Sequence, residues 1–441
     1  MLPKLKNKLQ LGFYSTFEEQ LSHSHPLYKL ANQIHWEIFD NAFSKHYSAT
    51  MGAPAKSIRL MVGLLILKQV RNLSDETVVE QWAENNYFQY VCGEEYYSNQ
   101  QPCVATELVE FRKRIGEEGF ALILQESIRL NGKDSNDDNL SADTTVQEKN
   151  ITYPTDDKLY KKIIKKCQSI AEKENVVLRQ SYTRTLHSLS ILQRMKHRKQ
   201  GEPIARKANK KVKTIAGRLT RELERKLTSE SLNRWGSDLQ LFTRVLMQRR
   251  GDSDKIYSLH EPNVKCFSKG KEHKKYEFGS KVSILITQRT GVIVGAMNFE
   301  QNMHDSKTLP AVLEQYKQLT GRQAKNIYVD RGYKGPRVIE ETNIQIPRPQ
   351  KNITQTKRKR HKRRAAIEPC IGHLKSDYRL SRNFLKGNYG DMVNVMMAAA
   401  AMNFKRMMNL WKTGSHLFVV FLSMIIEETF FAQKRNQFIA G

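Results

Sequence analysis

Three acidic residues, far apart in the sequence, have the types and settings expected of a divalent-metal site. Asp143 and Asp330 each lie at or near the end of a short apolar segment predicted to be a β-strand, and Glu368 lies at the start of a predicted helix. Carboxylate oxygens suit Mg²⁺, and two such ions about 3.5–4 Å apart can activate an attacking oxygen and stabilise a leaving oxygen. These residue types therefore predict phosphoryl transfer.

The combination of the acids carries this interpretation, because either aspartate alone is more typical of a turn cap. If the two strands are parallel neighbours, Asp143 and Asp330 lie side by side, and a packed helix can present Glu368 opposite them. Three uncompensated carboxylates at such a place would repel one another, so a bound metal is expected.

Basic residues flank Glu368 at helical spacing. Arg364 precedes it by four residues and Lys375 follows it by seven, so the three side chains fall within one helical face. We expect both cations to hold a phosphate backbone beside the metal. Pro369 cannot sit unstrained in a helix interior, so the helix is expected to start near Glu368, which leaves only the spacing to Lys375 securely helical.

An uninterrupted basic run, residues 357–364, precedes Glu368. Such a run is often a solvated loop, but its position beside the third acid favours contact with a DNA backbone. The predicted DNA contacts are the cations of this run together with Arg331 and Lys375: Lys357, Arg358, Lys359, Arg360, Lys362, Arg363 and Arg364. Residues 269–275 are weaker evidence of the same kind. His304 or Asp305 could assist at the site, although a turn cap is the simpler interpretation.

The charge of the chain is unevenly distributed. The 441 residues carry a net charge of +28, yet residues 1–150 hold 15 Lys and Arg against 20 Asp and Glu, so the remainder holds 58 against 25. This asymmetry predicts a polyanionic partner for the later two-thirds, and nucleic acid is the usual one. A membrane-surface protein would need basic amphipathic helices with aromatic faces, and the basic runs here are largely of another kind.

Cysteine usage and apolar segments exclude other classes. The five cysteines lie far apart without a Cys-x-x-Cys pair, so the sequence has neither an obvious zinc ribbon nor a disulfide framework. The N-terminus lacks the apolar core of a signal peptide. The apolar segment Leu417–Ile426 is about half as long as a membrane span requires. We expect a cytoplasmic protein with no membrane partner.

Residues 1–130 are predicted to form an all-α N-terminal domain. Ile58–Val70 is an apolar helix, and Ser74 is a typical N-cap for a second helix that continues to Gly93. A third helix follows Cys103. Three short helices with tight connections are compatible with a helix-turn-helix that reads DNA and equally with a plain bundle.

The remaining chain is predicted to be a mixed α/β core interrupted by a helical insert. The expected domains are a linker with the first catalytic strand (131–156), a basic helical insert (157–257), the rest of the catalytic domain (258–411) and a C-terminal tail (412–441). The expected later strands are Tyr276–Thr287, Gly291–Phe299 and Asn326–Asp330, with a turn at Thr290-Gly291. The expected helices are Thr308–Leu319, Ala365–Tyr378 and a buried Met392–Met408.

Several short blocks, in this order and spacing, resemble the DDE transposases of bacterial insertion sequences, in the group with a helical N-terminal domain and a Tyr-Arg-Glu-Lys signature. The similarity spans roughly Lys56 to Trp411. The blocks are Ala142–Val146, Tyr153–Asp156, Tyr276–Gly279, His304–Ser306, Asp330–Tyr333 and Arg364–Lys375. The resemblance implies a ribonuclease-H-like fold with Asp143, Asp330 and Glu368 as catalytic acids. His361 stands where the signature has tyrosine, a departure that puts the DNA contact of that position in doubt.

The resemblance implies a transposase of an insertion sequence, a mobile element, that binds the terminal inverted repeats of its own element. Two Mg²⁺ ions, for which Mn²⁺ can substitute, would support DNA cleavage and strand transfer. The implied partners are double-stranded DNA of the element ends and target, with the protein a homodimer or higher oligomer, in the bacterial cytoplasm near the nucleoid. One alternative is a structure-specific nuclease on the same fold. The other is a domesticated, non-catalytic DNA-binding protein, and the intact acid triad disfavours this second alternative.

Overall fold

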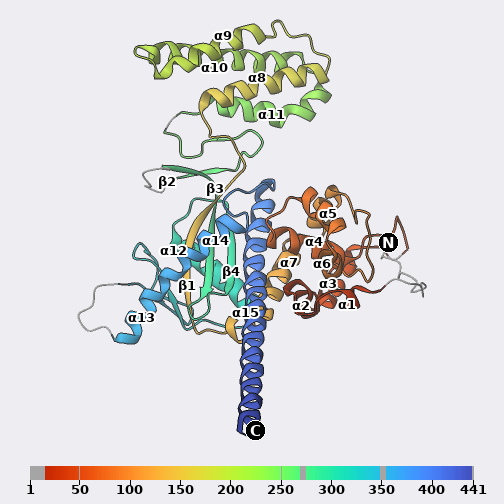
Figure 1. Ribbon diagram of the computed structural model, residues 1–441. Helices are drawn as coiled ribbons and strands as arrows, with labels where there is room; N and C mark the ends of the chain where they lie inside the picture. Colours follow the sequence, from red (N-terminus) through yellow and green to blue (C-terminus); the bar gives the residue numbers. More distant parts are fainter. Residues whose placement is uncertain (1–14, 49, 250, 269–274, 348–353, 440–441) are drawn as a thin grey trace.

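The computed structural model describes residues 15–48, 50–249, 251–268, 275–347 and 354–439, with side chains described as far as residue 414. In these residues a mixed β-sheet with flanking helices carries an N-terminal helical region on one side and a four-helix insert at one end (Figure 1). The mixed α/β prediction is confirmed.

The described sheet has seven strands in the order β2-β3-β1-β5-β7-β6, with β4 paired to β3. The strands are β1 (Asn139–Glu148), β2 (Lys265–Ser268), β3 (Tyr276–Thr287), β4 (Ile293–Phe299), β5 (Asn326–Tyr328), β6 (Val338–Ile339) and β7 (Thr342–Gln345). β1 pairs antiparallel with β3 and parallel with β5. The predicted β3 matches residue for residue, and Gly291 adopts a positive φ of 74° in the turn before β4.

The first catalytic strand is longer than predicted. β1 pairs with β3 from Leu140 to Glu148, so Asp143 lies in the middle of the strand, and its expected place near a strand end was wrong. The β-branched residues at positions 144–146 favour an extended chain, and pairing with the long strand β3 carries β1 on to Glu148. Only the pairing to β5 stops early, at Ser141.

Three helices pack against the sheet. α12 (Asp305–Thr320) contacts β3 and β4, α14 (Ile367–Asp377) contacts β1, and α15 (Gly387–Ile439) contacts β4. The predicted buried segment of α15 is confirmed, since Val393, Ala398 and Phe404 are all buried. α15 runs continuously past residue 412, where a separate tail is predicted.

Most of the basic run before Glu368 is helical and does not form a solvated loop. α13 (Gln355–Arg363) begins at the N-cap Thr354, whose hydroxyl accepts a hydrogen bond from the Lys357 amide. The helix is attached to the turn between β3 and β4. The Arg363 Nε donates to the Gln288 carbonyl at 2.8 Å, and the Gln288 side chain donates to the Arg360 carbonyl at 3.1 Å. These distant contacts are invisible in a run of like charges.

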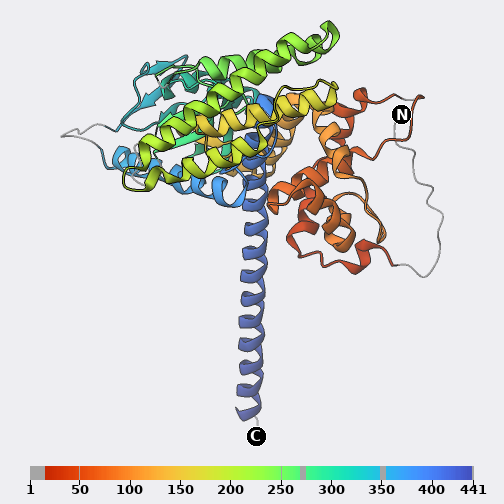
Figure 2. The same ribbon diagram turned by 90° about the horizontal axis from the view of Figure 1, so that it is seen from above.

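The N-terminal region shares the core of the sheet. Its helices are α1 (Phe17–Gln20), α2 (Pro26–Gln33), α3 (Trp36–Phe43), α4 (Ile58–Val70), α5 (Asp75–Glu84), α6 (Asn86–Val91) and α7 (Ala105–Leu130). One apolar cluster continues from Leu27 in α2 to Met408 in α15. α15 lies between the N-terminal helices and the sheet in both ribbon views (Figures 1 and 2).

Individual N-terminal helices confirm and correct the predictions. The limits of α4 match, and 11 of its 13 residues are buried. The Ser74 hydroxyl caps α5 by accepting from the Thr77 amide at 3.1 Å. The single helix predicted from Ser74 to Gly93 was wrong, because Asn85 is extended and its side chain caps α6 as a separate helix. α7 bends at Gly116, whose φ of 62° favours glycine.

The insert has a core of its own. It consists of α8 (Asp156–Lys173), α9 (Thr183–Arg194), α10 (Gly201–Lys226) and α11 (Ser229–Met247), as predicted for a basic helical segment. Its apolar cluster includes Ile164, Leu219 and Phe242, and all the described buried residues of this cluster lie between Leu159 and Leu259. Two short stretches, before α8 and after α11, connect this module to the sheet (Figure 1).

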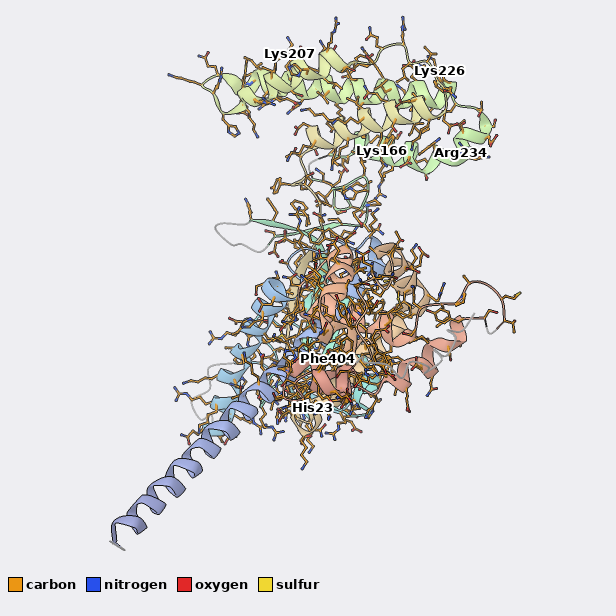
Figure 3. All side chains as sticks on the ribbon, turned by 45° about the vertical axis from the view of Figure 1, so that its right-hand side comes forward. His23, Lys166, Lys207, Lys226, Arg234 and Phe404 are labelled. Atoms are coloured by element: carbon orange, nitrogen blue, oxygen red, sulfur yellow. The ribbon has the colours of Figure 1, made fainter. Side chains whose placement is uncertain are left out.

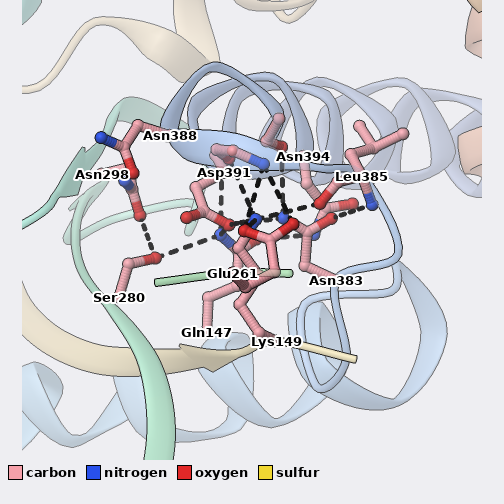
Figure 4. Close-up of polar contacts among 12 residues, drawn as sticks. Gln147, Lys149, Glu261, Ser280, Asn298, Asn383, Leu385, Asn388, Asp391 and Asn394 are labelled. Carbon is pink, nitrogen blue, oxygen red and sulfur yellow. Dashed lines mark hydrogen bonds and ion pairs between the residues drawn. The ribbon is translucent and has the colours of Figure 1, made fainter. Parts of the chain in front are cut away.

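A buried charged group, here called the neck cluster (Lys149, Glu261 and Asp391), joins those two stretches to α15 (Figure 4). The Lys149 ammonium lies 2.8 Å from Asp391 Oδ1 and 3.4 Å from Glu261 Oε2. It also donates to the carbonyls of Leu385 and Gly387, each at 3.0 Å. Because all three charges are buried and paired, the cluster fixes the base of the insert against the catalytic domain.

Across the described part of the chain, no helix combines the length and the apolar character needed to cross a membrane. The side chains of Leu417–Ile426 lie outside the described residues.

Candidate active site

Asp143 lies in β1, and Asp330 follows the end of the neighbouring strand β5 by two residues. β1 and β5 are parallel, with Ser141 opposite Tyr328, and each aspartate comes two residues later in its chain. The expected parallel pairing of these strands is confirmed. Both aspartates line one pocket, together with Thr144, Asp305 and Tyr333 among others. This pocket is the place in the fold where carboxylates of distant sequence segments meet.

Burial and the neighbouring acids disfavour the ionised form of Asp143 in this pocket. Burial raises the pKa of Asp143, and the nearby charges of Asp330 and Asp305 raise it further. The Thr144 amide, which donates to Asp143 Oδ1 at 2.7 Å, and the cation of Arg364 act in the opposite direction. Because burial and like charges disfavour the ionised carboxylate, a positive charge placed here would be bound favourably.

The sequence did not predict the ion pair between Asp305 and Lys281. Asp305 starts α12 and accepts from the Thr144 hydroxyl at 2.8 Å, and it forms an ion pair with Lys281 of β3. His304 is the N-cap of α12 and accepts from the Ser306 amide at 3.2 Å, so the predicted turn cap is confirmed for His304. Asp305 was a candidate because it follows a predicted strand. The sequence has no comparable signal for Lys281, whose role depends on its contact with Asp305 in the fold.

Glu368 forms an ion pair with Arg364 and does not line the pocket that contains the two aspartates. α14 begins at the buried Ile367, which leaves Pro369 in its first turn, as expected. The Glu368 carboxylate is 64% exposed and lies 3.0 Å from the guanidinium of Arg364, which is only 14% exposed. Arg364 also lowers the pKa of Asp143, so its charge acts on two of the three acids. Its predicted contact with DNA stays a prediction.

The other predicted DNA-binding residues divide into docked and exposed cations. Arg360 and Arg363 bond to the adjoining strands and turn, and Lys375 lies 3.9 Å from the Glu277 carboxylate. Arg363 is exposed despite its hydrogen bonds, and the other exposed members are Lys357, Arg358, Lys359, Lys362 and Arg331. Of the run 269–275, residues 269–274 lie outside the described residues.

His361 faces the strand that precedes Asp330. Its ring meets the buried Tyr328 ring edge-on at a centroid distance of 5.3 Å. Burial lowers the pKa of His361, and its Nδ1 has no hydrogen-bond partner among the described residues. An imidazole packed on Tyr328 is a different arrangement from an exposed phosphate-binding side chain.

The carboxylates fit a divalent metal by their chemistry, though the described side chains do not enclose one. Two aspartates that line one pocket, one with a raised pKa, offer hard oxygen ligands of the kind that Mg²⁺ and Mn²⁺ take. Among the residues that the structure describes, no three His, Cys, Asp or Glu side chains are gathered closely enough to hold an ion. Glu368, bound to Arg364, is the remaining carboxylate of the predicted set.

Comparisons with known proteins agree with this setting of acids in a mixed sheet. A family model described as a transposase domain (DUF772) matches residues 15–114, and one described as a transposase DDE domain matches residues 252–404. A protein of Rhizobium meliloti, named uncharacterized protein ORF8 in nfe locus, is 42% identical over 163 residues, which cover 36% of this chain and 78% of that protein. No solved structure matches the chain.

These matches define a class of DNA-cleaving enzymes that act on mobile elements, and DNA is therefore the substrate. The chain belongs to the DDE transposases of insertion sequences. The family generally uses divalent metals.

Proposed function

We propose that this transposase binds the terminal inverted repeats of its own insertion sequence and carries out both DNA cleavage and strand transfer. Its catalytic domain is then ribonuclease-H-like, and Asp143, Asp330 and Glu368 hold two Mg²⁺ ions, with Mn²⁺ as a substitute. The active complex is a homodimer or higher oligomer in the bacterial cytoplasm.

The observation that best supports the proposal is that Asp143 and Asp330 line one pocket. The two residues are separated by nearly 190 positions in the sequence, and the parallel strands β1 and β5 bring them together. Burial first, and then the nearby charge of Asp330, raise the pKa of Asp143, which is a cost of keeping this carboxylate ionised in the free protein. A site that binds cations makes use of that cost.

In this proposal Asp143, Asp330 and Glu368 would hold the metal ions, which would supply charge neutralisation at the reacting phosphate and activation of the attacking oxygen. In the free protein the positive charge of Arg364 partly neutralises the negative charges of Asp143 and Glu368. When these two carboxylates bind metal, the Arg364 side chain is free to bind a DNA phosphate. The exposed cations of α13, Lys357, Arg358, Lys359 and Lys362, together with Arg331 beside Asp330, then hold the DNA backbone next to the site. Catalysis is mainly positioning and charge neutralisation.

The test uses Asp143→Ala, Asp330→Ala and Glu368→Ala with duplexes that carry the element ends. We expect each variant to lose cleavage in Mg²⁺ almost completely while its affinity for the ends stays within about threefold of the wild type, because these carboxylates hold metal rather than DNA. Glu37→Ala, an acid far from the site in the N-terminal region, is the matched control. Near-normal cleavage by any one variant removes that residue from the site.

A strand-transfer assay separates the proposal from a nuclease on the same fold. Pre-cleaved ends with a free 3′-hydroxyl are incubated with a target plasmid and Mg²⁺. A transposase joins them to the target, whereas a structure-specific nuclease gives hydrolysis products only. Absence of joined products with active, cleaving enzyme would favour the nuclease.

A further inference from the structure

The long helix α10 of the insert carries an acid-free basic segment. Residues 203–221 contain seven Lys and Arg and no Asp or Glu. In the whole insert, residues 157–257, 26 Lys and Arg stand against 10 Asp and Glu, so the acids are placed elsewhere in the module. A separation of this kind leaves one part of the surface strongly positive.

Six of the α10 cations share one face of the helix. At 100° per residue they fall within a sector of about 120°, and over 18 residues they extend about 27 Å. We call this set the α10 stripe; it consists of Lys207, Lys210, Lys211, Arg218, Arg221 and Arg225, all exposed. The opposite face of α10 supplies Val212, Leu219 and Leu223 to the insert core.

Ion pairing separates the stripe from several other cations of the insert. Lys166 pairs with Asp238, Arg234 with Glu174, and Arg244 with Asp254. The pairs Arg206–Glu202 and Lys226–Glu222 lie near the two ends of the stripe. Among the described residues, no ion pair involves a stripe cation. Six like charges held on one helix repel one another, and the attraction of Glu222 for Arg225 at one end of the stripe partly offsets this repulsion.

The helix that carries the stripe lies on the outer side of the insert (Figure 1). α9 and α10 form the layer of the insert farthest from the sheet, and Lys207 and Lys226 project from that outer layer, whereas Lys166 and Arg234 lie on the inner helices (Figures 1 and 3). An extended partner can therefore lie along α10 without meeting the catalytic domain.

We propose that the α10 stripe binds the phosphate backbone of duplex DNA. The inference rests on the proposed function and assigns one of its DNA contacts to a helix outside the catalytic domain. The length of about 27 Å corresponds to about eight base pairs. α10 contains no aromatic residue, so it offers bases no stacking platform, which disfavours single strands. Its apolar face is buried in the insert, which disfavours a membrane.

The test neutralises three stripe residues in the full-length protein: Lys210→Gln, Lys211→Gln and Arg218→Gln. Binding to a duplex of mixed sequence and to the element ends is measured over a series of salt concentrations. We expect at least about a tenfold loss of affinity near 0.1 M salt for both duplexes, and a fall of about 2–3 in the slope of log affinity against log salt. The charge-preserving variant Lys210→Arg, Lys211→Arg, Arg218→Lys should keep the slope.

The matched control removes three charges from paired cations of the same insert: Lys166→Gln, Arg234→Gln and Arg244→Gln. It should change the affinity by less than about threefold, since these cations are already neutralised. Circular dichroism and thermal unfolding check that each variant is folded.

The outcomes separate this inference from the proposed function. Unchanged affinity and slope in the stripe variant, with cleavage still dependent on Asp143, would overturn the stripe alone. Equal losses in stripe and control variants would reduce the effect to net charge and would also overturn it. A wild type that neither binds nor cleaves duplex DNA would overturn both proposals, and preferential binding of single strands or of an acidic protein would overturn the stripe as a duplex site.

Discussion

The N-terminal helical region and the insert are both all-helical, yet they relate to the catalytic sheet in opposite ways. The N-terminal helices share one continuous apolar core with the sheet and α15, whereas the insert closes a core of its own. Their charges differ in the same sense. Residues 1–150 are net acidic, and the insert is strongly basic. Shared core makes a region part of the scaffold, and a separate core leaves a region free to present a surface.

Contacts near Glu368 show what the shared core does. The buried Gln69 side chain of α4 donates to the Tyr378 carbonyl at the end of α14, at 2.7 Å, and Arg379 donates to the Leu73 carbonyl. The Tyr389 hydroxyl of α15 donates to the Arg112 carbonyl of α7. The N-terminal region therefore braces the helix that carries Glu368. The insert reaches the same domain through the neck cluster and the strands beside it.

Removing each region in turn should give the largest contrast. The Asp156 carboxylate and the Lys255 ammonium, at the two ends of the insert, lie 3.9 Å apart, so the two ends are close enough for a Gly-Ser linker to replace the residues between them. We expect that variant to fold and to keep metal-dependent nicking, with weakened DNA binding. A variant lacking residues 15–104 should be insoluble or unfolded, because the deletion removes 22 of the 64 described buried residues of the apolar cluster and exposes their neighbours. Yield of monodisperse protein and circular dichroism report the outcome.

Matched core substitutions test the same contrast without deletions. Phe120 in α7 and Phe242 in α11 are both fully buried, so replacing either with alanine should cost about 3–5 kcal/mol within its own core. Phe120→Ala should lower the unfolding temperature of the catalytic domain and its cleavage rate. Phe242→Ala should lower only an insert transition, followed by hydrogen exchange of α8–α11. Equal loss of cleavage in the two variants would mean that the cores are coupled.

The neck cluster should give the smallest effect, as a dependence on pH. Burial raises the pKa of Asp391 from its ordinary value of 3.8 to about 6, against the opposing charge of Lys149. Between these values the folded chain binds the proton more tightly than the unfolded chain, so this contribution to stability is present at low pH and falls as pH rises through about 6. At about 1.4 kcal/mol per tenfold change in proton binding, the contribution is at most about 3 kcal/mol.

Asp391→Asn should remove that dependence. The stability of the wild type, measured by thermal unfolding, should fall relative to this variant as pH rises from about 4 to about 6. The other groups of the cluster are unchanged in this variant. Glu261 still faces Lys149, and Gln147, Asn383 and Asn394 still form the polar surroundings. Parallel pH profiles for the two proteins would show that Asp391 is charged throughout.

Local sequence determined much of the secondary structure. The limits of α4 and β3, the Ser74 cap and the helical insert follow from apolar spacing, capping residues and scarce Gly and Pro, which act over a few neighbouring residues. The order of short motif blocks likewise pointed to the DDE transposases, as the family matches show. These features are written in the chain because the forces behind them are short in range along it.

Tertiary structure alone decided which groups meet. The length of β1, the docking of α13, the separation of α5 from α6 and the pairing of Asp305 with Lys281 depend on partners elsewhere in the chain. The same is true of Arg364, whose spacing predicted a phosphate contact but which lies between Glu368 and Asp143. Whether a helical region shares a core with the sheet or closes its own depends on which apolar faces find each other in three dimensions, and periodicity reports that a face exists without naming the surface that buries it.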